Sequence, residues 1–304
     1  MQVPEQLEFM ENSRKPQKHT TERMDGKRCV ITGGTSGVGY QAALRLAEAG
    51  ADLIIVCRNQ EKGDAVRQEI INKYFTQVDV VLADFLHLDQ VKAAADKILE
   101  HYPHVDILIN NAGIHATQRR LNEEGIETVF CVNHLAAFIM TKKLLPRLIS
   151  SAPAKVLYVN SEGHRFNGLD LNDLDWAKRH YRGLKGYGAA KTAQLLTLWE
   201  FAEQLEGTPV TINAMHPGAV RTNIGLDNGI FYRAYNQYFL RWFLKDPAIA
   251  GDAIHYLLAA PEMAEVTGKF FNLTHEEKPA AHALDREVGK KVWRISHEMT
   301  GLAE

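Results

Sequence analysis

The chain has 304 residues, of which 45% are hydrophobic and 24% are charged, and its 35 basic and 37 acidic side chains leave a formal net charge of −2. This length suits one large α/β domain with a sizeable core. The balanced charge provides no overall field that would attract nucleic acid or an acidic membrane, so we expect no nucleic-acid partner.

Cysteine and histidine usage argues against disulfides and bound metal. The three cysteines (Cys29, Cys57 and Cys131) form no CxxC pair, and the thirteen histidines form neither an HExxH motif nor a tight His/Cys cluster. We therefore expect a reducing, cytoplasmic location, no disulfide framework and no metal site.

The N-terminal segment is polar. Residues 1–25 contain no apolar run long enough for a signal peptide or a membrane anchor. We predict that residues 1–26 form a polar arm that lies on, or trails from, a single domain of residues 27–304. No later stretch is expected to approach a membrane span.

From Lys27 onward, short apolar runs rich in Val and Ile alternate with helical patterns. Continuous apolar runs of this length are typical of strands buried on both faces of a parallel sheet. The alternation predicts an α/β fold, a single Rossmann-type doubly wound parallel sheet of about seven strands with helices on both faces. The expected strands are Cys29–Thr32, Leu53–Cys57, Val78–Ala83, Ile107–Asn110, Val156–Asn160, Val210–Met215 and Lys269–Asn272, and the clearest expected helices are Tyr40–Ala49, Gln90–Glu100 and Val129–Leu148.

A glycine-rich turn, Thr32-Gly33-Gly34-Thr35-Ser36-Gly37-Val38-Gly39, joins the first expected strand to the first expected helix. Glycines allow a tight turn and let backbone N–H groups approach a pyrophosphate, and the helix N-terminus adds a favourable partial charge. A glycine turn alone is weak evidence, but this position favours a dinucleotide site. The expected cofactor contacts here are Gly33, Thr35, Ser36, Gly37, Val38 and Gly39.

Four motifs resemble those of the short-chain dehydrogenase/reductase family and occur in that family's order. They are the TGxxxGxG turn, Asn110-Asn111-Ala112-Gly113, Tyr187-Gly188-Ala189-Ala190-Lys191 (YxxxK), and Pro217-Gly218 with Thr222. The resemblance runs from about Lys27 to Asn272 and is greatest for the retinol dehydrogenase-like and related carbonyl-reducing members. It implies further cofactor contacts from Asn111, Ala112, Gly113, Pro217, Gly218, Val220 and Thr222.

The YxxxK motif predicts the catalytic centre. Tyr187 and Lys191 are four residues apart, which places them on one face of a helix. A phenol with a pKa of about 10 is a poor base at neutral pH, and a nearby ammonium lowers that pKa. The resemblance implies that Tyr187 exchanges a proton with the substrate oxygen and that Lys191 holds the nicotinamide ribose. It also implies that Ser161 hydrogen-bonds the substrate oxygen and that Asn133 positions Lys191 through water.

Neighbouring residues offer competing assignments. Tyr181 also starts a YxxxK sequence, but Gly183 and Gly186 break its segment, so we expect Tyr181 at the surface or at a pocket rim. His134 and His164 lie beside expected catalytic residues, but we expect neither to take a direct part in catalysis. The family often has Ser-Ser where this chain has Asn160-Ser161; because the second position is the catalytic one, we expect little effect.

The end of the second strand favours NADP(H) over NAD(H). Cys57 stands where NAD-preferring relatives carry an acidic residue, and Arg58 follows it. An arginine fork beside a neutral residue suits a 2′-phosphate, although NAD(H) remains the alternative. We expect Arg58 and Asn59 to contact this end of the cofactor, and Asp84 and Phe85 to lie beside the adenine.

An aromatic stripe marks the excursion at residues 223–246. Phe231, Tyr235, Tyr238 and Trp242 recur on one face of a helix. The resemblance implies a flap over the substrate, and an aromatic wall suits a large apolar molecule. Two alternatives stay open: packing onto the domain or onto a second subunit of a homo-oligomer, and peripheral contact with a membrane.

The combined expectation is an NADP(H)-dependent oxidoreductase that interconverts an alcohol and a carbonyl on an apolar small molecule. One alternative is a catalytically silent NADP(H)-binding regulatory protein, which the presence of Ser161, Tyr187 and Lys191 disfavours. Another is a nucleotide-sugar epimerase or dehydratase, which the glycine spacing and the Asn-Asn-Ala-Gly motif disfavour.

Overall fold

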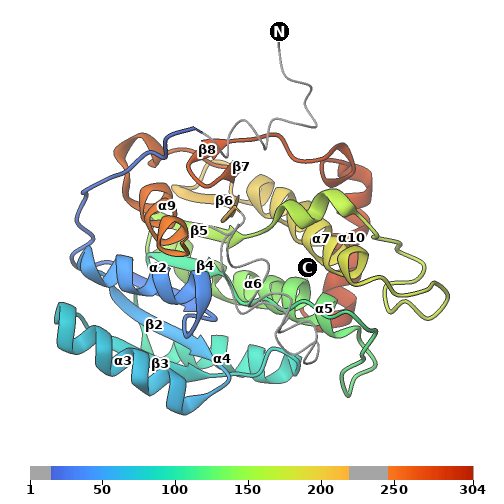
Figure 1. Cartoon of the computed structure of the whole chain (residues 1–304), viewed down its shortest axis with the longest axis horizontal. Coiled ribbons are helices and arrows are strands. Elements are labelled where there is room, and N and C mark those ends of the chain that lie inside the picture. The colour runs from blue at the N-terminus through green and yellow to red at the C-terminus, as the bar shows by residue number, and fades with distance from the viewer. Residues whose placement is uncertain (1–14, 219–245, 304) are drawn as a thin grey trace, which may run out of the picture.

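One eight-stranded sheet organises the chain, in the order β3-β2-β1-β4-β5-β6-β7-β8 (Figure 1). The computed structural model describes residues 15–218 and 246–303. Neighbouring strands are parallel except β8, which runs antiparallel to β7. The strands are β1 (Arg28–Thr32), β2 (Asp52–Cys57), β3 (Val78–Leu82), β4 (Ile107–Asn110), β5 (Ala154–Val159), β6 (Val210–His216), β7 (Lys269–Asn272) and β8 (His275–Glu276).

Helices cover both faces of this sheet. On one face lie α2 (Gly37–Glu48), α3 (Gln60–Tyr74) and α9 (Ala248–Ala259), and α2 packs directly on α9 (Figure 1). On the other face lie α4 (Leu88–His101), α6 (Ala136–Ser150) and α7 (Gly183–Gln204), with α10 (Arg286–Thr300) packed against α7. The shorter elements are α5 (Thr128–Phe130), the π-helical turn η2 (Cys131–Leu135), and the 3₁₀ turns η3 (Glu162–Phe166), η5 (Pro261–Met263) and η6 (Ala281–Ala283).

The predicted fold class is confirmed, with a doubly wound parallel sheet between two helical layers. The seven predicted strands are present, and β8 is an addition that sequence analysis did not anticipate. A two-residue strand is too short to show an alternating pattern. The sheet order reverses between β1 and β4, and in such sheets ligands bind at the carboxyl ends of the strands near this switch point.

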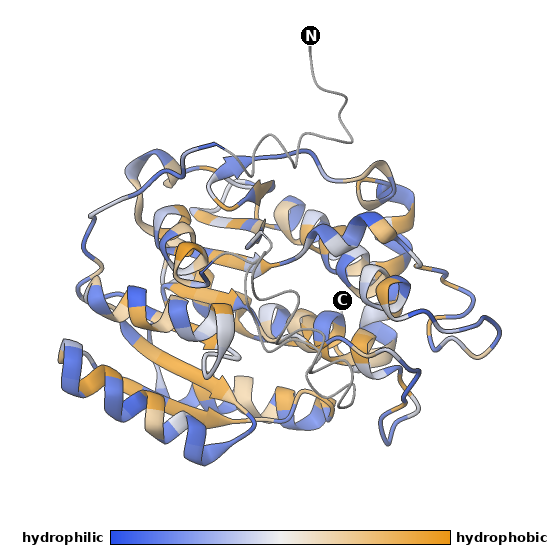
Figure 2. Ribbon diagram, viewed as in Figure 1, coloured by the Kyte–Doolittle hydropathy of each residue, from blue (hydrophilic) through white to orange (hydrophobic). Residues whose placement is uncertain are grey.

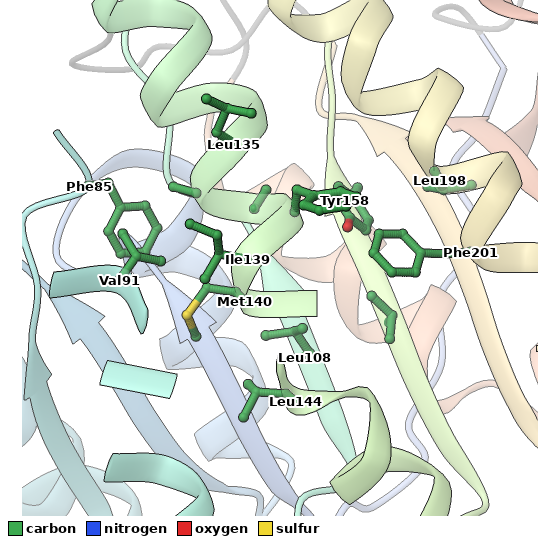
Figure 3. Close-up of a cluster of buried hydrophobic side chains, with 14 of the residues drawn as sticks. Phe85, Val91, Leu108, Leu135, Ile139, Met140, Leu144, Tyr158, Leu198 and Phe201 are labelled. Atoms are coloured by element: carbon green, nitrogen blue, oxygen red, sulfur yellow. The ribbon is translucent and has the colours of Figure 1, made fainter. Parts of the chain in front are cut away.

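The core explains why the strand sequences are almost continuously apolar. Figure 2 shows the central strands as mostly hydrophobic, whereas the outer helices alternate between apolar and polar residues. In the cluster between the sheet and α4, α6 and α7, Leu108 and Tyr158 from strands meet Met140 and Phe201 from helices (Figure 3). The buried Tyr158 hydroxyl lies 2.5 Å from Thr141 Oγ1, so the polar end of this ring is hydrogen-bonded.

One helical segment among the described residues, 128–150, is long and apolar enough to cross a membrane by composition, with a mean hydropathy of 1.2. The expectation that no stretch would approach this limit was therefore wrong. In the structure, 89% of this segment's most apolar window is buried inside the domain. The segment is a core helix, and its apolarity reflects packing against the sheet and α4.

The described part of the N-terminal arm, residues 15–26, lies on the domain. The Lys18 main-chain N–H donates to Thr274 Oγ1 at 3.0 Å, and His255 Nε2 donates to the Glu22 carbonyl at 2.9 Å. Met24 is buried against the α2 and β2 side of the sheet. These contacts join the arm to β7, β8 and α9.

Candidate active site

The glycine turn is held against the end of β4 by a side-chain network. Thr32 Oγ1 accepts hydrogen bonds from the main-chain N–H groups of Asn111 and Ala112, both at 3.0 Å. Asn111 Nδ2 donates to the carbonyl oxygens of Thr32 at 2.9 Å and Gly33 at 3.2 Å. The Asn-Asn-Ala-Gly motif therefore supports the turn, and these contacts explain the need for a small donor at Asn111.

Gly33 and Gly39 in this turn could not carry a Cβ without strain or a collision. Gly33 has φ +69°, a left-handed conformation that residues with a Cβ rarely adopt. A Cβ at Gly39 would collide with Asn111 Nδ2 and the Gly33 carbonyl. The first turn of α2 contains no acidic residue, and the Ser36 side chain makes no capping hydrogen bond. The N–H groups at this helix end therefore face no capping side chain, as a phosphate site requires.

The end of β2 carries the expected cofactor-selecting residues. Cys57 is buried, and Arg58 and Asn59 are exposed. Asn59 Oδ1 accepts from the Lys62 main-chain N–H at 2.8 Å, so Asn59 caps α3. The Asn59 side chain is therefore engaged in capping α3, and Arg58 is the charged side chain at the end of β2 that can reach a cofactor.

After the end of β3, the side chains of Asp84 and Phe85 lie in different surroundings. Asp84 Oδ1 accepts from the Leu86 main-chain N–H at 3.0 Å in a local turn. The Phe85 ring is buried in the core close to Val91 (Figure 3). The apolar ring packs into the core, so any contact of Phe85 with the adenine would come from its main chain.

Tyr187 lies in the second turn of α7, over the loop that follows β5. Its ring packs so closely on Gly163 that a Cβ there would come 2.7 Å from two ring carbons. Burial raises the pKa of Tyr187 to about 12, and a hydrogen bond with the Ser161 side chain acts in the opposite direction. Ser161 Oγ also accepts from the Gly163 N–H at 3.0 Å. The structure thus brings Ser161 and Tyr187 together, as the sequence predicts.

Lys191 follows one turn later on α7 and is 2% exposed. Its ammonium donates to the Val159 carbonyl at 2.8 Å and reaches Gln194 Oε1 at 3.4 Å. Burial lowers the pKa of Lys191 to about 7. Nζ lies 5.9 Å from the Tyr187 ring centroid, so the two groups are neighbours on one face of α7.

Asn133 lies in the π-helical turn η2 rather than in a regular α-helix. Its side chain is fully paired with one residue: Oδ1 accepts from the Ile114 N–H at 2.8 Å, and Nδ2 donates to the Ile114 carbonyl at 2.9 Å. Its own main-chain carbonyl accepts from Gln194 Nε2 at 2.8 Å. Asn133 therefore connects to Lys191 through the Gln194 side chain.

Tyr181, expected at the surface or at a pocket rim, is not a surface residue. It is buried, its hydroxyl donates to Glu127 Oε1 at 3.3 Å, and its ring packs edge-on against Trp176 at 5.3 Å. A Cβ at Gly186 would collide with the Tyr181 ring, so the glycine permits this packing. The placement makes Tyr181 a structural residue, which agrees with the preference for Tyr187 as the catalytic tyrosine.

The two neighbouring histidines have structural partners. His134 Nε2 lies 2.8 Å from Ser296 Oγ on α10, and burial lowers the pKa of His134 to about 3. His164 Nδ1 donates to the Ser161 carbonyl at 2.8 Å, and its Nε2 accepts from the Ala280 N–H at 3.1 Å. Both rings are neutral at pH 7 and hold segments in place.

A charged cluster lies beside the site. Glu162, His216 and Glu277 bring ligand atoms within 4.8 Å of one another, a grouping that sequence analysis did not foresee. Arg165 bridges the two carboxylates at 2.6 Å each, and His216 Nε2 lies 3.2 Å from Glu162 Oε1. Because Arg165 already pairs with both carboxylates, we interpret the cluster as an ion-pair network that joins η3, the end of β6 and the residue after β8.

Part of the expected site lies outside the described residues. Gly218 is described and adopts φ +72°, and its N–H donates to His216 Nδ1 at 3.2 Å. Pro217 precedes it at the end of β6. The predictions for Val220, for Thr222 and for the aromatic stripe fall on residues 219–245, which the structure does not describe.

Three residues beside Tyr187 and Lys191 were not predicted from the sequence. Gly163 provides space for the Tyr187 ring, and Gln194 contacts Lys191. His115 packs edge-on against Tyr187, with ring centroids 5.7 Å apart, and burial lowers its pKa. A signal existed for Gln194, because it is a polar residue inside an otherwise apolar helical run.

The chain is similar to known proteins over most of its length. The family model for the short chain dehydrogenases matches residues 27–228. Human retinol dehydrogenase 13 is 37% identical over 285 residues, covering 91% of this chain and 85% of the relative. Mouse retinol dehydrogenase 14 is 35% identical, covering 92% of this chain and 87% of the relative.

Solved structures share the same architecture. A crystal structure of an uncharacterized Mycobacterium paratuberculosis protein matches with a TM-score of 0.73 and 27% identity, covering 92% of this chain and 95% of that one. A Shigella flexneri short chain dehydrogenase complexed with NADP matches with a TM-score of 0.66 and 23% identity, covering 84% and 99%. The second likeness shows the fold alone.

Proposed function

Because this chain belongs to the short chain dehydrogenase family of oxidoreductases, we propose that it interconverts an alcohol and a carbonyl compound by hydride transfer with NADP(H). The observation that carries the proposal is the meeting of Ser161, Tyr187 and Lys191 at the carboxyl end of the sheet. The glycine turn before α2 lies at the same end. The groups that would bind the cofactor and the groups that would transfer the proton therefore lie at the same end of the sheet.

The residues present fit a dinucleotide. Gly39 lets the first turn of α2 pack against Asn111 and the Gly33 carbonyl, and the α2 N-terminus, which has no capping side chain and no acidic residue in its first turn, can receive a phosphate. Cys57 offers no carboxylate to accept ribose hydroxyls, and the exposed Arg58 suits a 2′-phosphate. When bound, the nicotinamide would supply or accept the hydride.

Tyr187 provides the proton. In carbonyl reduction the Tyr187 hydroxyl donates a proton to the substrate oxygen as negative charge develops there, while the Ser161 hydroxyl hydrogen-bonds the same oxygen. In alcohol oxidation Tyr187 accepts that proton. Since burial raises the Tyr187 pKa to about 12, the phenol is protonated at pH 7, which suits reduction. A positive charge on Lys191 favours the phenolate that oxidation requires.

Two separate observations support the proposed class of substrate. The relatives named retinol dehydrogenases are 33–37% identical over nine-tenths of this chain. The aromatic stripe at Phe231, Tyr235, Tyr238 and Trp242 would offer apolar surface to a bulky molecule. We propose an apolar alcohol or carbonyl, and retinoids belong first in a screen. The three free, buried cysteines support a cytoplasmic location.

An NADPH-oxidation screen over retinal, steroid ketones and aromatic aldehydes tests this function. Tyr187→Phe should reduce kcat by about 10²–10⁴-fold, because it removes the proton donor, and should leave NADPH binding unchanged. The matched control is Tyr181→Phe, which removes a phenol of the second YxxxK sequence and should retain activity. NADPH binding without turnover of any carbonyl would contradict the proposal and favour a regulatory protein.

A further inference from the structure

We propose that Gln194 is a positioning residue that joins the Lys191 ammonium directly to the main-chain carbonyl of Asn133. The inference rests on the proposed function, because it concerns how Lys191 is held for catalysis. Gln194 Oε1 lies 3.4 Å from Lys191 Nζ, and Gln194 Nε2 lies 2.8 Å from the Asn133 oxygen. A side chain thereby makes the link for which the sequence comparison suggested a water molecule.

The orientation of the Gln194 amide is fixed by its neighbours. Its oxygen faces two donors, Asn160 Nδ2 at 2.8 Å and Lys191 Nζ, and its nitrogen faces a carbonyl. The reversed amide would oppose donors to donors and an oxygen to an oxygen. Only the observed orientation satisfies all three partners, so the position of the acceptor beside Lys191 is determined.

Asn160 completes the arrangement. Its Nδ2 also donates to the Lys191 carbonyl at 3.0 Å, and its Oδ1 accepts from the Ser161 N–H at 2.8 Å. The residue that departs from the family's usual Ser-Ser is thus the partner of Gln194. One buried network connects Ser161 on one side to Lys191 and Asn133 on the other, and Asn133, Asn160, Lys191 and Gln194 are each at most 2% exposed.

The electrostatic surroundings make this neutral acceptor important. Within residues 15–218 and 246–303, no ion pair involves Lys191. Three elements pack around the Lys191 ammonium. Strand β5 contributes the neutral Val159 carbonyl, η2 contributes the neutral Asn133, and α7 contributes one titratable neighbour, Tyr187. Because no carboxylate among the described residues pairs with it, the buried Lys191 ammonium is stabilised by two neutral oxygens, the Val159 main-chain carbonyl and the Gln194 side-chain amide.

The test is a titration of Lys191 by NMR in cofactor-free protein carrying ¹³Cε-labelled lysine, with Lys191→Arg used to assign the signal. Gln194→Met keeps the side-chain length but removes the acceptor. The Lys191 pKa in this variant should fall by about one unit relative to the wild type, because the charged form loses a hydrogen bond. Thr197→Val is the matched control: Thr197 is equally buried on α7 and bonds only helix carbonyls.

Activity gives a second readout. If Lys191 loses its proton at a lower pH, the phenolate of Tyr187 is less favoured. The pH of half-maximal kcat for retinol oxidation should therefore rise in Gln194→Met and stay unchanged in Thr197→Val. Gln194→Asn, whose amide is one methylene too short to join both groups, should shift in the same direction and serves if the methionine variant does not fold. An unshifted Lys191 titration in a folded Gln194 variant would overturn the inference. Absence of turnover in the wild type would instead refute the proposed function, and the titration would still report on Gln194.

Discussion

The contact between Gly163 and the Tyr187 ring makes a sharp prediction. A methyl group at Gly163 would lie 2.7 Å from ring atoms Cδ1 and Cε1 and 3.2 Å from Ser161 Oγ. Carbon atoms in contact are normally about 3.5–4.0 Å apart, so in Gly163→Ala the ring must move by about 1 Å. If Tyr187 is the proton donor, as we propose, a displacement of this size costs on the order of 10²-fold in rate.

The assay separates this effect from general damage. In Gly163→Ala, kcat should fall by about 10²-fold, while the Kd for NADPH, measured by fluorescence, stays within error of the wild type. Gly289→Ala on α10 is the control, since its added Cβ would meet mainly the flexible Glu200 side chain. That variant should keep full activity and gain slightly in stability from helix propensity. A Gly163→Ala enzyme with near-normal kcat would show that Tyr187 is not the proton donor, or that its position is not critical.

Two further predictions concern charge. Arg58→Ala should raise KM for NADPH about 10- to 150-fold more than KM for NADH, since a charge-assisted contact is worth roughly 1.5–3 kcal/mol; a wild type that prefers NADH would contradict the assignment. For Lys191, the pKa is lowered to about 7 in the folded protein from 10.5, so between these values the unfolded chain binds a proton that the folded chain does not. This group therefore makes the free energy of unfolding rise with pH across that window. Urea titrations should show Lys191→Met most stabilised relative to the wild type at or below pH 7, with the difference shrinking toward pH 10; a constant difference would argue against a buried, depressed lysine.

The strands could be predicted from sequence because each is a short, continuous apolar run bounded by polar residues. The motif residues were also predictable, since their spacing is specific. The turn η2 was not, because a change from 3.6 to a wider helical period over five residues leaves no trace in a hydrophobic pattern. The seven parallel strands therefore agree within two residues at each end, whereas the local geometry at Asn133 does not.

Tyr181 illustrates a different limit. Gly183 and Gly186 were interpreted as breaks that expose the segment, but both glycines mark close packing. A Cβ at Gly183 would come 2.6 Å from the Ala116 carbonyl, and one at Gly186 would collide with the Tyr181 ring. Sequence shows that a glycine is present, but only the tertiary structure shows whether it bends the chain or admits a neighbour. The sequence could not place the Phe85 ring for a related reason, because an apolar residue after a strand fits a core as well as a ligand site.

The π-helical turn has a consequence for insertions and deletions. Its bond from the Ala136 N–H to the Cys131 carbonyl spans five residues, one more than an α-helical bond. Deleting a single residue between Cys131 and Leu135 would allow an uninterrupted α-helix from Thr128 to Ser150, and the solubility and helix content could survive. Because the wide turn accommodates one extra residue, the helix on either side of the deletion would keep its orientation. The carbonyls of the turn would, however, take part in regular helical hydrogen bonds, so the hydrogen bond from Gln194 Nε2 to the Asn133 carbonyl would be lost and the chain would keep its architecture without this link to Lys191.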